Sequence, residues 1–315
     1  MKLSIIVVVH NAFPFVDKCL GSLYKDNLKS TEIIIIDNAS QEYGLARIKH
    51  KYPFVKYIRN KKNLGFAKAV NMGAKKSKGK YILILNPDTI MLDGTIIYNL
   101  NYMDKHKDVA LVGCRVFSKD KILQMSAGYA YPGLMNHIYE YNYVLYKILK
   151  KIIPSYNPIL YPIKDHFKNL FVKHLIGVYL MIRKDTFIKL LGFDENYFLY
   201  REETDFCKRL IDKKWKIAYL PEKGGVVHLG AGSSGLKNTQ SSNYYLKSTY
   251  YFIKKKYSKS YCYFVWFIGL LSSIMSVLYV LIERLYNKNK PEKNNNLNNW
   301  INILRWHLSL EIFKI

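Results

Sequence analysis

The sequence has few cysteines, and none of them is spaced for a metal site. Cys19, Cys114, Cys207 and Cys262 lie far apart along the chain, and no two form a C-x-x-C pair. This spacing argues against a structural zinc site and against a disulfide framework. It is typical of a protein that works in a reducing compartment.

The signatures of two common classes of binding protein are also missing. The first apolar run leads into His10-Asn11-Ala12-Phe13 and not into a G-x-G-x-x-G turn, which argues against a dehydrogenase. No zinc-finger spacing, RNA-recognition signature or basic heptad is present, so we expect no nucleic-acid partner. The net charge of +26 therefore points to another anionic partner, either a phosphate-bearing substrate or an acidic membrane face.

The N-terminal apolar run is too short for a signal peptide. Leu3–Val9 spans seven residues and is not followed by a small-residue cleavage site. We interpret it as a buried first strand and expect the body of the protein to lie in the cytosol. With 315 residues, 50% of them hydrophobic, the chain can form one large or two small domains, and it is neither disordered nor fibrous.

Short apolar runs alternate with amphipathic stretches through most of the chain. The predicted strands are Leu3–Val9, Glu32–Ile36, Val55–Ile58, Tyr81–Leu85, Val109–Phe117, His174–Ile182, Ile217–Leu220 and Val226–Val227. The predicted helices are Pro14–Asp26, Gly65–Ser77, Gly94–His106, Lys184–Leu191 and a helix that opens near Glu202 and runs to about Ile211. Continuously apolar strands separated by helices indicate an α/β domain with a mostly parallel central sheet.

Polar residues follow three of these strands. His10-Asn11 ends the first, Asp37-Asn38-Ala39-Ser40 ends the second, and Asn86-Pro87-Asp88 ends the fourth. Parallel sheets bind ligands at the carboxyl ends of their strands, so these groups predict a binding site. Each group alone could equally be a turn or a helix cap.

Further candidates can be assigned by their chemistry. Asp88 could hold Mg²⁺ or Mn²⁺ through its carboxylate, and His228, which follows a short strand, is either a second ligand or a structural histidine. Glu202, Glu203 and Asp205 cluster at a helix start, where they could supply a general base or simply complement the helix dipole. The backbone around Asn63-Leu64-Gly65-Phe66, before a helix that contains Asn71, could meet phosphate or ribose.

Together these motifs resemble glycosyltransferase family 2. The carriers, in chain order, are Val7-Val8-Val9-His10-Asn11, Asp37-Asn38-Ala39-Ser40, Asn63-Leu64-Gly65-Phe66-Ala67, Asn71, Asn86-Pro87-Asp88, Phe198-Leu199-Tyr200 with Glu202-Glu203-Thr204-Asp205, and Val226-Val227-His228. They span about residues 1 to 235, and their order is similar to that of the rhamnosyltransferase-like branch. The resemblance implies a GT-A fold and an inverting enzyme that uses a nucleotide-diphosphate sugar.

The resemblance also implies roles for individual residues. Asp37 would contact the base; His10, Asn11, Asn38, Asn63, Gly65, Phe66, Asn71, Asn86 and Asp88 would line the nucleotide-sugar site. Asp88 and His228 would bind the cation, although Asn86 replaces the first acid of the family's D-x-D motif. Glu203 stands at the position of the catalytic base, where the family usually has aspartate, and Glu202 is the alternative base.

Two other regions favour a membrane. The insertion at about 128–170 is rich in tyrosine and lysine, which is typical of a membrane interface, of an acceptor site or of an ordinary packed subdomain. Residues 236–260 form a basic linker or helix. The hydrophobic 261–283 segment, which has no charge from Tyr261 to Ile282, is predicted as a helix that crosses the membrane, lies in its plane or is buried. Residues 284–315 are predicted as a polar linker containing Asn294–Asn296, followed by an amphipathic helix.

These patterns predict an inverting glycosyltransferase at the cytoplasmic face of the membrane that takes part in cell-surface polysaccharide synthesis. The best estimate of its donor is dTDP-rhamnose, otherwise a UDP-hexose, and its acceptor would be a glycan or lipid-linked hydroxyl. The alternative is an inactive membrane-associated scaffold with the same fold.

Overall fold

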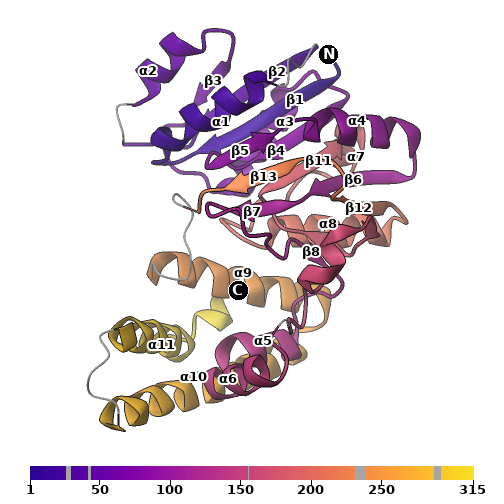
Figure 1. The fold of residues 1–315 in the computed structure, drawn as a ribbon. Helices are drawn as coiled ribbons and strands as arrows, with labels where there is room; N and C mark the ends of the chain where they lie inside the picture. The colour runs from indigo at the N-terminus through magenta and orange to yellow at the C-terminus, as the bar shows by residue number, and fades with distance from the viewer. Residues whose placement is uncertain (26–29, 42–43, 155, 231–238, 287–291) are drawn as a thin grey trace. The chain divides into compact units, whose positions relative to one another are not determined.

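The computed structural model describes residues 1–25, 30–41, 44–154, 156–230, 239–286 and 292–315. The chain divides into two compact units. The first comprises Met1–Tyr129 and Ile163–Ser233, and the second comprises Ala130–Pro162 and Ser234–Ile315. Figure 1 shows strands and helices in the first unit and helices in the second.

The first unit is built on a mixed sheet with eight strands in the described part of the chain. Their spatial order is β3 (Lys56–Arg59), β2 (Thr31–Asp37), β1 (Leu3–Val9), β4 (Tyr81–Leu85), β11 (Tyr179–Arg183), β6 (Val109–Cys114), β12 (Lys216–Leu220) and β9 (Leu170–Phe171). β1 to β4 run parallel, as do β6 and β12, whereas β11 is antiparallel to both of its neighbours. The predicted α/β class with a mostly parallel sheet is confirmed.

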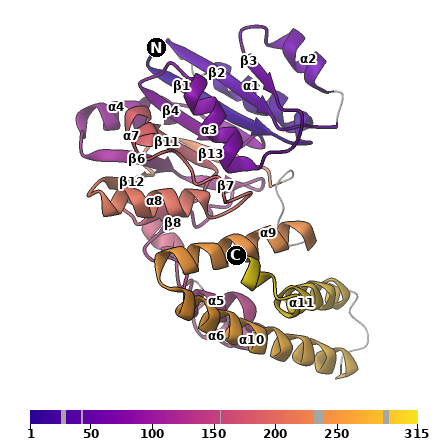
Figure 2. The same cartoon turned by 180° about the vertical axis from the view of Figure 1, so that it is seen from behind.

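Helices cover both faces of this sheet (Figures 1 and 2). The helices α1 (Phe13–Lys25), α2 (Gly44–Lys51) and α4 (Thr95–Lys105) contribute to one core with alternate residues of β1. On the other face, α3 (Phe66–Lys76) approaches so closely that a Cβ on Gly73 would lie 2.7 Å from the Ile6 side chain. The helices α7 (Lys184–Lys189) and α8 (Glu202–Asp212) pack through Phe187 and Phe206.

Two small sheets complete the first unit. One has β13 (Gly225–His228) between β5 (Thr89–Leu92) and β7 (Val116–Ser118), and the other pairs β8 (Ala127–Gly128) with β10 (His174–Leu175). A short 3₁₀ helix spans Ile163–Phe167.

Two predicted strands are each divided between sheets. The single strand expected over Val109–Phe117 is β6 and β7, and the one expected over His174–Ile182 is β10 and β11. A continuous apolar run in the sequence does not indicate the point at which the chain passes from one sheet to another. The predictions also omitted α2 and β5, the latter because its four residues follow the Asn86-Pro87-Asp88 turn directly.

The second unit is helical in its described residues. It contains α5 (Leu134–Tyr141), α6 (Tyr143–Ile152), α9 (Thr239–Lys256), α10 (Lys259–Tyr286), α11 (Glu292–Leu308) and a 3₁₀ turn over Glu311–Lys314. Tyr250, Val265 and Trp306 belong to its apolar core.

Two boundaries in this region differ from the predicted ones. The insertion predicted at about 128–170 is Ala130–Pro162, and it belongs with the C-terminal helices and not with the sheet domain. Asn294–Asn296, expected in a polar linker, lie within α11. The glycine-serine loop predicted after His228 falls largely on residues 231–235, outside the described residues.

Candidate active site

The polar residues that follow the first, second and fourth predicted strands lie along one edge of the main sheet. β1 lies between β2 and β4, and Val9 is opposite Asp37 while Val7 is opposite Leu85. His10, Asp37 and Asn86 therefore start at the same carboxyl edge, which is where ligands bind in such sheets.

Asn38 organises the loop before α3. Its amide nitrogen donates to the Asn63 Oδ1 at 2.7 Å and to the Gly65 carbonyl at 3.1 Å. Its amide oxygen accepts from the Asn60 amide and from the Leu64 backbone, each at 3.0 Å. An asparagine side chain can make about four hydrogen bonds, so all of this capacity is used within the protein. Asn38 therefore shapes this loop, and its predicted contact with the nucleotide stays a prediction.

Gly65 brings this loop against the segment before the acidic cluster. Its φ of +83° favours glycine, and a Cβ there would lie 2.6 Å from the Phe198 carbonyl. Phe66 donates its backbone N–H to the same carbonyl at 2.7 Å. The loop containing Asn63 and the turn leading to Glu202 are thus joined directly.

Asp37 is paired with a residue that the sequence analysis missed. Its carboxylate accepts from the Ser40 backbone at 2.9 Å and lies 3.3 Å from the Arg59 guanidinium. Arg59 is the last residue of β3 and is directly opposite Asp37 in the sheet. The sequence did contain a signal for this residue, because Arg59 is a basic residue directly after the predicted strand Val55–Ile58.

His10 and Asn11 connect the first strand end to the second. A ring nitrogen of His10 lies 3.1 Å from the Asn38 carbonyl. The backbone N–H of Asn11 donates to the Ser40 Oγ at 3.0 Å. Asn11 adopts φ of +51°, the left-handed region that asparagine tolerates. Both residues lie beside Asp37.

Asp88 and His228 meet although 140 positions separate them. β13 pairs with β5, and His228 is directly opposite Thr89, the residue after Asp88. The histidine Nε2 lies 3.3 Å from the Asp88 Oδ2, and the Leu229 N–H donates to the Asp88 carbonyl at 2.8 Å. The two predicted metal ligands are therefore adjacent.

This pair fits a divalent cation as a partial ligand set. Among the described residues, no group of three or more histidine, cysteine or acidic side chains is arranged to hold a metal ion. One carboxylate oxygen and one imidazole suit Mn²⁺, and a cation of this kind commonly completes its coordination with substrate phosphates and water. The Asn86 amide, next to this pair in sequence, replaces a carboxylate and lowers the negative charge.

Glu202 and Glu203 open α8 in different surroundings. Glu202 is buried, and its Oε2 has no hydrogen-bond partner among the described residues. Glu203 is half-buried; it accepts from the Thr204 hydroxyl at 3.1 Å, and its Cγ lies 3.8 Å from a Cβ built on Gly177. The next residue, Val178, accepts from the Asn86 backbone at 3.1 Å, so Glu203 is close to the Asn86-Pro87-Asp88 turn.

The pKa of each glutamate is shifted upward. Burial raises the pKa of Glu202 well above its usual value, and the charge of Glu203 raises it further. Burial also raises the pKa of Glu203, while Arg201 opposes this shift. Pairs of carboxyl groups whose environments differ are candidates for acid–base chemistry.

The turn before this pair is strained. Tyr200 and Arg201 have φ of +71° and +67°, in the left-handed region that non-glycine residues seldom adopt. Strain of this kind occurs at functional sites, where the surrounding structure holds it.

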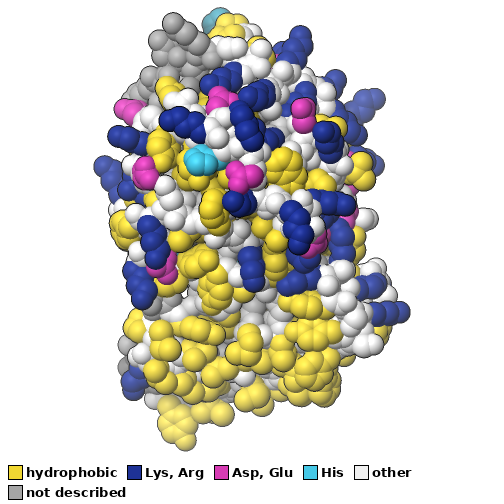
Figure 3. Space-filling view, turned by 90° about the vertical axis from the view of Figure 1, so that its right-hand side faces the viewer, with side chains coloured by type: hydrophobic (Ala, Val, Ile, Leu, Met, Phe, Trp, Pro, Cys, Tyr) yellow, Lys and Arg dark blue, Asp and Glu magenta, His cyan; other side chains and the backbone are white. Residues whose placement is uncertain are grey.

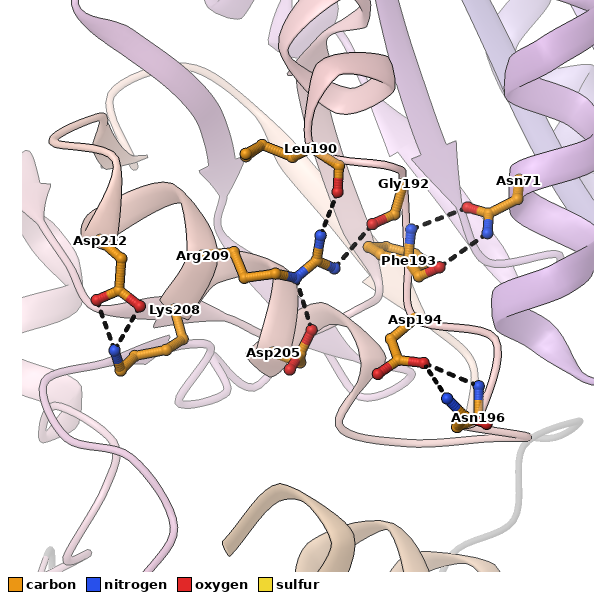
Figure 4. A network of polar contacts seen from close by, with 10 residues as sticks. All are labelled: Asn71, Leu190, Gly192, Phe193, Asp194, Asn196, Asp205, Lys208, Arg209 and Asp212. Carbon is orange, nitrogen blue, oxygen red and sulfur yellow. Dashed lines mark hydrogen bonds and ion pairs between the residues drawn. The ribbon is translucent and has the colours of Figure 1, made fainter. Parts of the chain in front are cut away.

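A second polar network holds the segment before this turn (Figure 4). Asn71 accepts from the Phe193 N–H at 2.9 Å and donates to its carbonyl at 2.8 Å. Arg209 contacts the Asp205 carboxylate at 2.8 Å and the Gly192 carbonyl at 2.7 Å. Asp205 is thus held by an ion pair within the protein, and the predicted contact of Asn71 with the nucleotide stays a prediction.

The fold and this edge of the sheet define a sugar-nucleotide transferase of the GT-A class. The model of the family described as glycosyl transferase family 2 matches residues 4–191. The chain belongs to this family and is a glycosyltransferase.

Curated relatives extend the similarity over most of the chain. Rhamnosyltransferase WbbL of Escherichia coli K12 is 25% identical over 259 residues, which cover 80% of this chain and 92% of the relative. The N-acetylglucosaminyl-diphospho-decaprenol L-rhamnosyltransferase of Mycobacterium tuberculosis is 24% identical over 270 residues, which cover 81% and 85%. These matches confirm the rhamnosyltransferase-like resemblance.

A solved structure, GalNAc-T7 with UDP, GalNAc and Mn²⁺, has the same fold. It aligns with a TM-score of 0.54 and 16% identity over 72% of this chain. This chain spans 43% of that longer protein, and the likeness concerns the fold alone.

Proposed function

We propose that the protein is an inverting rhamnosyltransferase that moves rhamnose from dTDP-rhamnose to a hydroxyl of a lipid-linked glycan, in cell-surface polysaccharide synthesis. The observation that carries this proposal is the similarity to two rhamnosyltransferases over four fifths of the chain. One of these relatives is named for a diphospho-decaprenol substrate, which supports a lipid-linked acceptor. The second choice of donor is a UDP-hexose.

The reaction is a single displacement. Glu203 removes the proton of the acceptor hydroxyl, and that oxygen attacks the anomeric carbon from the face opposite the nucleotide. The bond from this carbon to the diphosphate oxygen breaks as the new glycosidic bond forms, so the configuration inverts and the nucleoside diphosphate leaves.

The choice of Glu203 as the base follows from its surroundings. A general base must be ionised and must reach its substrate. Glu203 is half-buried and lies near Asn86, whereas Glu202 is buried, and burial together with the charge of Glu203 holds the Glu202 pKa well above its usual value. We therefore assign Glu202 a protonated, positioning role.

The donor site would be formed along the sheet edge. Asp37 would contact the base, with Arg59 beside it, and the loop from Asn63 to Phe66 would meet the ribose and the phosphates through its backbone. Asp88 and His228 would hold Mg²⁺ or Mn²⁺, which when bound would offset the charge of the departing diphosphate.

The membrane is the proposed location of the acceptor. In the described residues one helix, Lys259–Tyr286, is long and apolar enough to cross a bilayer. We place the protein at the cytoplasmic face of the membrane, where the lysine-rich surface would meet anionic lipid headgroups.

A donor panel tests the function. Purified protein with Mn²⁺ or Mg²⁺ and a membrane extract is incubated with dTDP-rhamnose, UDP-glucose, UDP-galactose, UDP-N-acetylglucosamine or GDP-mannose, and the released nucleoside diphosphate is measured. We expect release with dTDP-rhamnose, lost in Asp88→Ala. Release with another donor alone would replace rhamnose, and no release or thermal shift with any donor would favour the inactive scaffold.

A further inference from the structure

The helix α10 has two different faces. Large apolar side chains on one face are exposed, among them Phe264, Phe267, Leu271, Met275, Leu278, Ile282 and Leu285. The buried residues are mostly small or polar: Cys262, Val265, Gly269, Ser272, Ser273, Ser276 and Val280. At about 100° per residue, the exposed set falls within roughly 140° of arc and the buried set occupies the opposite side.

The exposed face is an uninterrupted apolar stripe. No charged residue occurs from Tyr261 to Ile282, and Figure 3 shows a broad area of hydrophobic side chains on the helical second unit. A stripe of this size on the surface marks a site that is covered by a partner or by lipid.

Polar groups are packed against the middle of the buried face. A Cβ on Gly269 would lie 2.4 Å from the His137 Nε2 and 2.7 Å from the Tyr250 hydroxyl. Ser276 accepts from the Tyr143 N–H at 2.8 Å and contacts the Tyr141 carbonyl at 3.0 Å. Tyr141 is the last residue of α5, and Tyr143 is the first residue of α6. If α10 crossed a bilayer, these two helix ends would lie near the centre of the bilayer, where backbone polar groups are excluded from lipid contact.

The neighbours of α10 are also too polar to cross with it. Lys147 on α6 pairs with Glu283 at 2.8 Å, and α6 carries Lys150 and Lys151 in its last turn. Among the described helices, α10 alone is apolar and long enough to span. Placing the packed bundle in hydrocarbon would therefore bury several charges, each at considerable cost.

We propose that α10 is an in-plane membrane helix, which lies along the bilayer surface with its apolar stripe among the acyl chains and its small-residue face on the helices of the second unit. This inference deepens the proposed membrane partner, and its test measures lipid contact and not sugar transfer. A helix of 28 residues is about 42 Å long and would insert to a depth of about 5–10 Å.

The charge of the second unit favours an anionic bilayer as the occupant over a second copy of the chain. Residues 130–162 and 234–315 contain 15 lysines and arginines but only four glutamates and no aspartate. Lys254, Lys255, Lys256 and Lys259 lie before or at the start of α10, and Arg284 lies near its end. Two such units would repel each other, whereas anionic headgroups would attract both.

The depth of four labels along α10 tests the orientation. The native cysteines are buried, so cysteines introduced in place of Phe264, Leu271, Leu278 and Leu285 can be labelled selectively with an environment-sensitive fluorophore. These positions are seven residues apart on the exposed side. With vesicles of phosphatidylglycerol and phosphatidylcholine, quencher lipids should report similar, shallow depths for all four labels.

Two other results would overturn the proposal. A label at Leu271 at the bilayer centre, with Phe264 and Leu285 shallow, would mean that the helix crosses the membrane. Labels that are shielded without vesicles and unaffected by quencher lipids would mean that a second copy of the chain covers the stripe.

A charge substitution gives an independent measurement. The double variant Leu271→Glu with Leu278→Glu should reduce co-sedimentation of the full chain with these vesicles by about tenfold or more, because the stripe drives insertion. Ile122→Glu, at a 67% exposed apolar position in the first unit, is the matched control and should bind as the wild type does. Equal binding by all three proteins would refute lipid contact by α10.

Discussion

The Nε2 of His228 lies 3.3 Å from the Oδ2 of Asp88, although 140 positions separate the two residues in the sequence. The pairing of β13 with β5 produces this contact, because it sets His228 opposite Thr89. The small three-stranded sheet thus delivers an imidazole to the carboxylate that follows β4. A carboxylate and an imidazole held this close can act together on a cation or, without one, as an ion pair.

We expect Asp88→Ala and His228→Ala to reduce transfer by about 100-fold or more. The loss of groups that only orient a metal ligand already costs about 10- to 100-fold. The His228 variant should also need more Mn²⁺ for half-maximal rate, which a metal titration of nucleoside diphosphate release measures. Asp108→Ala, which removes an exposed ion pair with Lys216, is the matched control and should keep the wild-type rate.

The two glutamates at the start of α8 should respond differently to the same change. Glu203→Gln should lower the transfer rate by about 100- to 10,000-fold, the usual contribution of a general base. Glu202→Gln should keep most of the activity, because this carboxyl is already neutral in our assignment. The pH profile of kcat/KM is the second readout, and its acidic limb should be unchanged in Glu202→Gln. The reverse order of effects would make Glu202 the base.

The stability of the protein should depend on pH through Glu202. Its pKa is higher in the folded than in the unfolded chain, so the folded state binds more protons and stability falls as pH rises past the usual value of 4.5. Glu202→Gln removes this dependence. We expect the Tm of Glu202→Gln to rise relative to the Tm of the wild type as the pH increases from 5 to 8, measured by thermal unfolding. A constant difference across this range would contradict the assigned burial.

The sequence was sufficient for the parts of the site that follow directly from local pattern. The strand ends at His10, Asp37 and Asn86 could be placed because each follows a short apolar run, and parallel strands bring such ends to one edge. The opening of a helix at Glu202 was visible from its acidic first turn.

Pairings between distant segments could not be predicted in the same way. Arg59 reaches Asp37 only because β3 is the neighbour of β2, and β11 enters the sheet antiparallel between β4 and β6. The role of Asn38 could not be predicted for the same reason. Its four hydrogen bonds depend on the path of the loop after β3, which brings residues 60–65 against Asn38. Neither strand order nor loop path is encoded in the hydrophobic period.

Arg209 should contribute more to the free energy of unfolding than its neighbour Lys208. Its guanidinium contacts Asp205, whose side chain is 5% exposed, and the carbonyls of Leu190 and Gly192 (Figure 4). Arg209→Met would leave the Asp205 carboxylate buried without its cation, at a cost of about 3 kcal/mol. Lys208→Met breaks only an exposed pair with Asp212 and should cost about 0.5 kcal/mol or less. Urea unfolding of both variants makes the comparison, and equal losses would argue against the network.

The second unit is stabilised by a buried chain of hydrogen bonds with a defined direction. His307 Nδ1 lies 2.8 Å from the Ile303 carbonyl, which can only accept, so this nitrogen carries the proton and Nε2 is an acceptor. Tyr250 therefore donates to His307 Nε2 at 2.9 Å and accepts from His137 Nε2.

Tyr250→Phe should destabilise the second unit by about 2–4 kcal/mol, because it removes the hydroxyl from two buried imidazoles. Tyr286→Phe, at an 84% exposed position, is the control and should have no measurable effect. Burial lowers the pKa of His307 to about 4, so the unfolded chain binds more protons below the usual value of 6.5, and stability should fall as pH drops from there toward 4. Hydrogen exchange of α9 and α11 measures both effects, and protection that is unchanged in Tyr250→Phe would contradict the proposed chain.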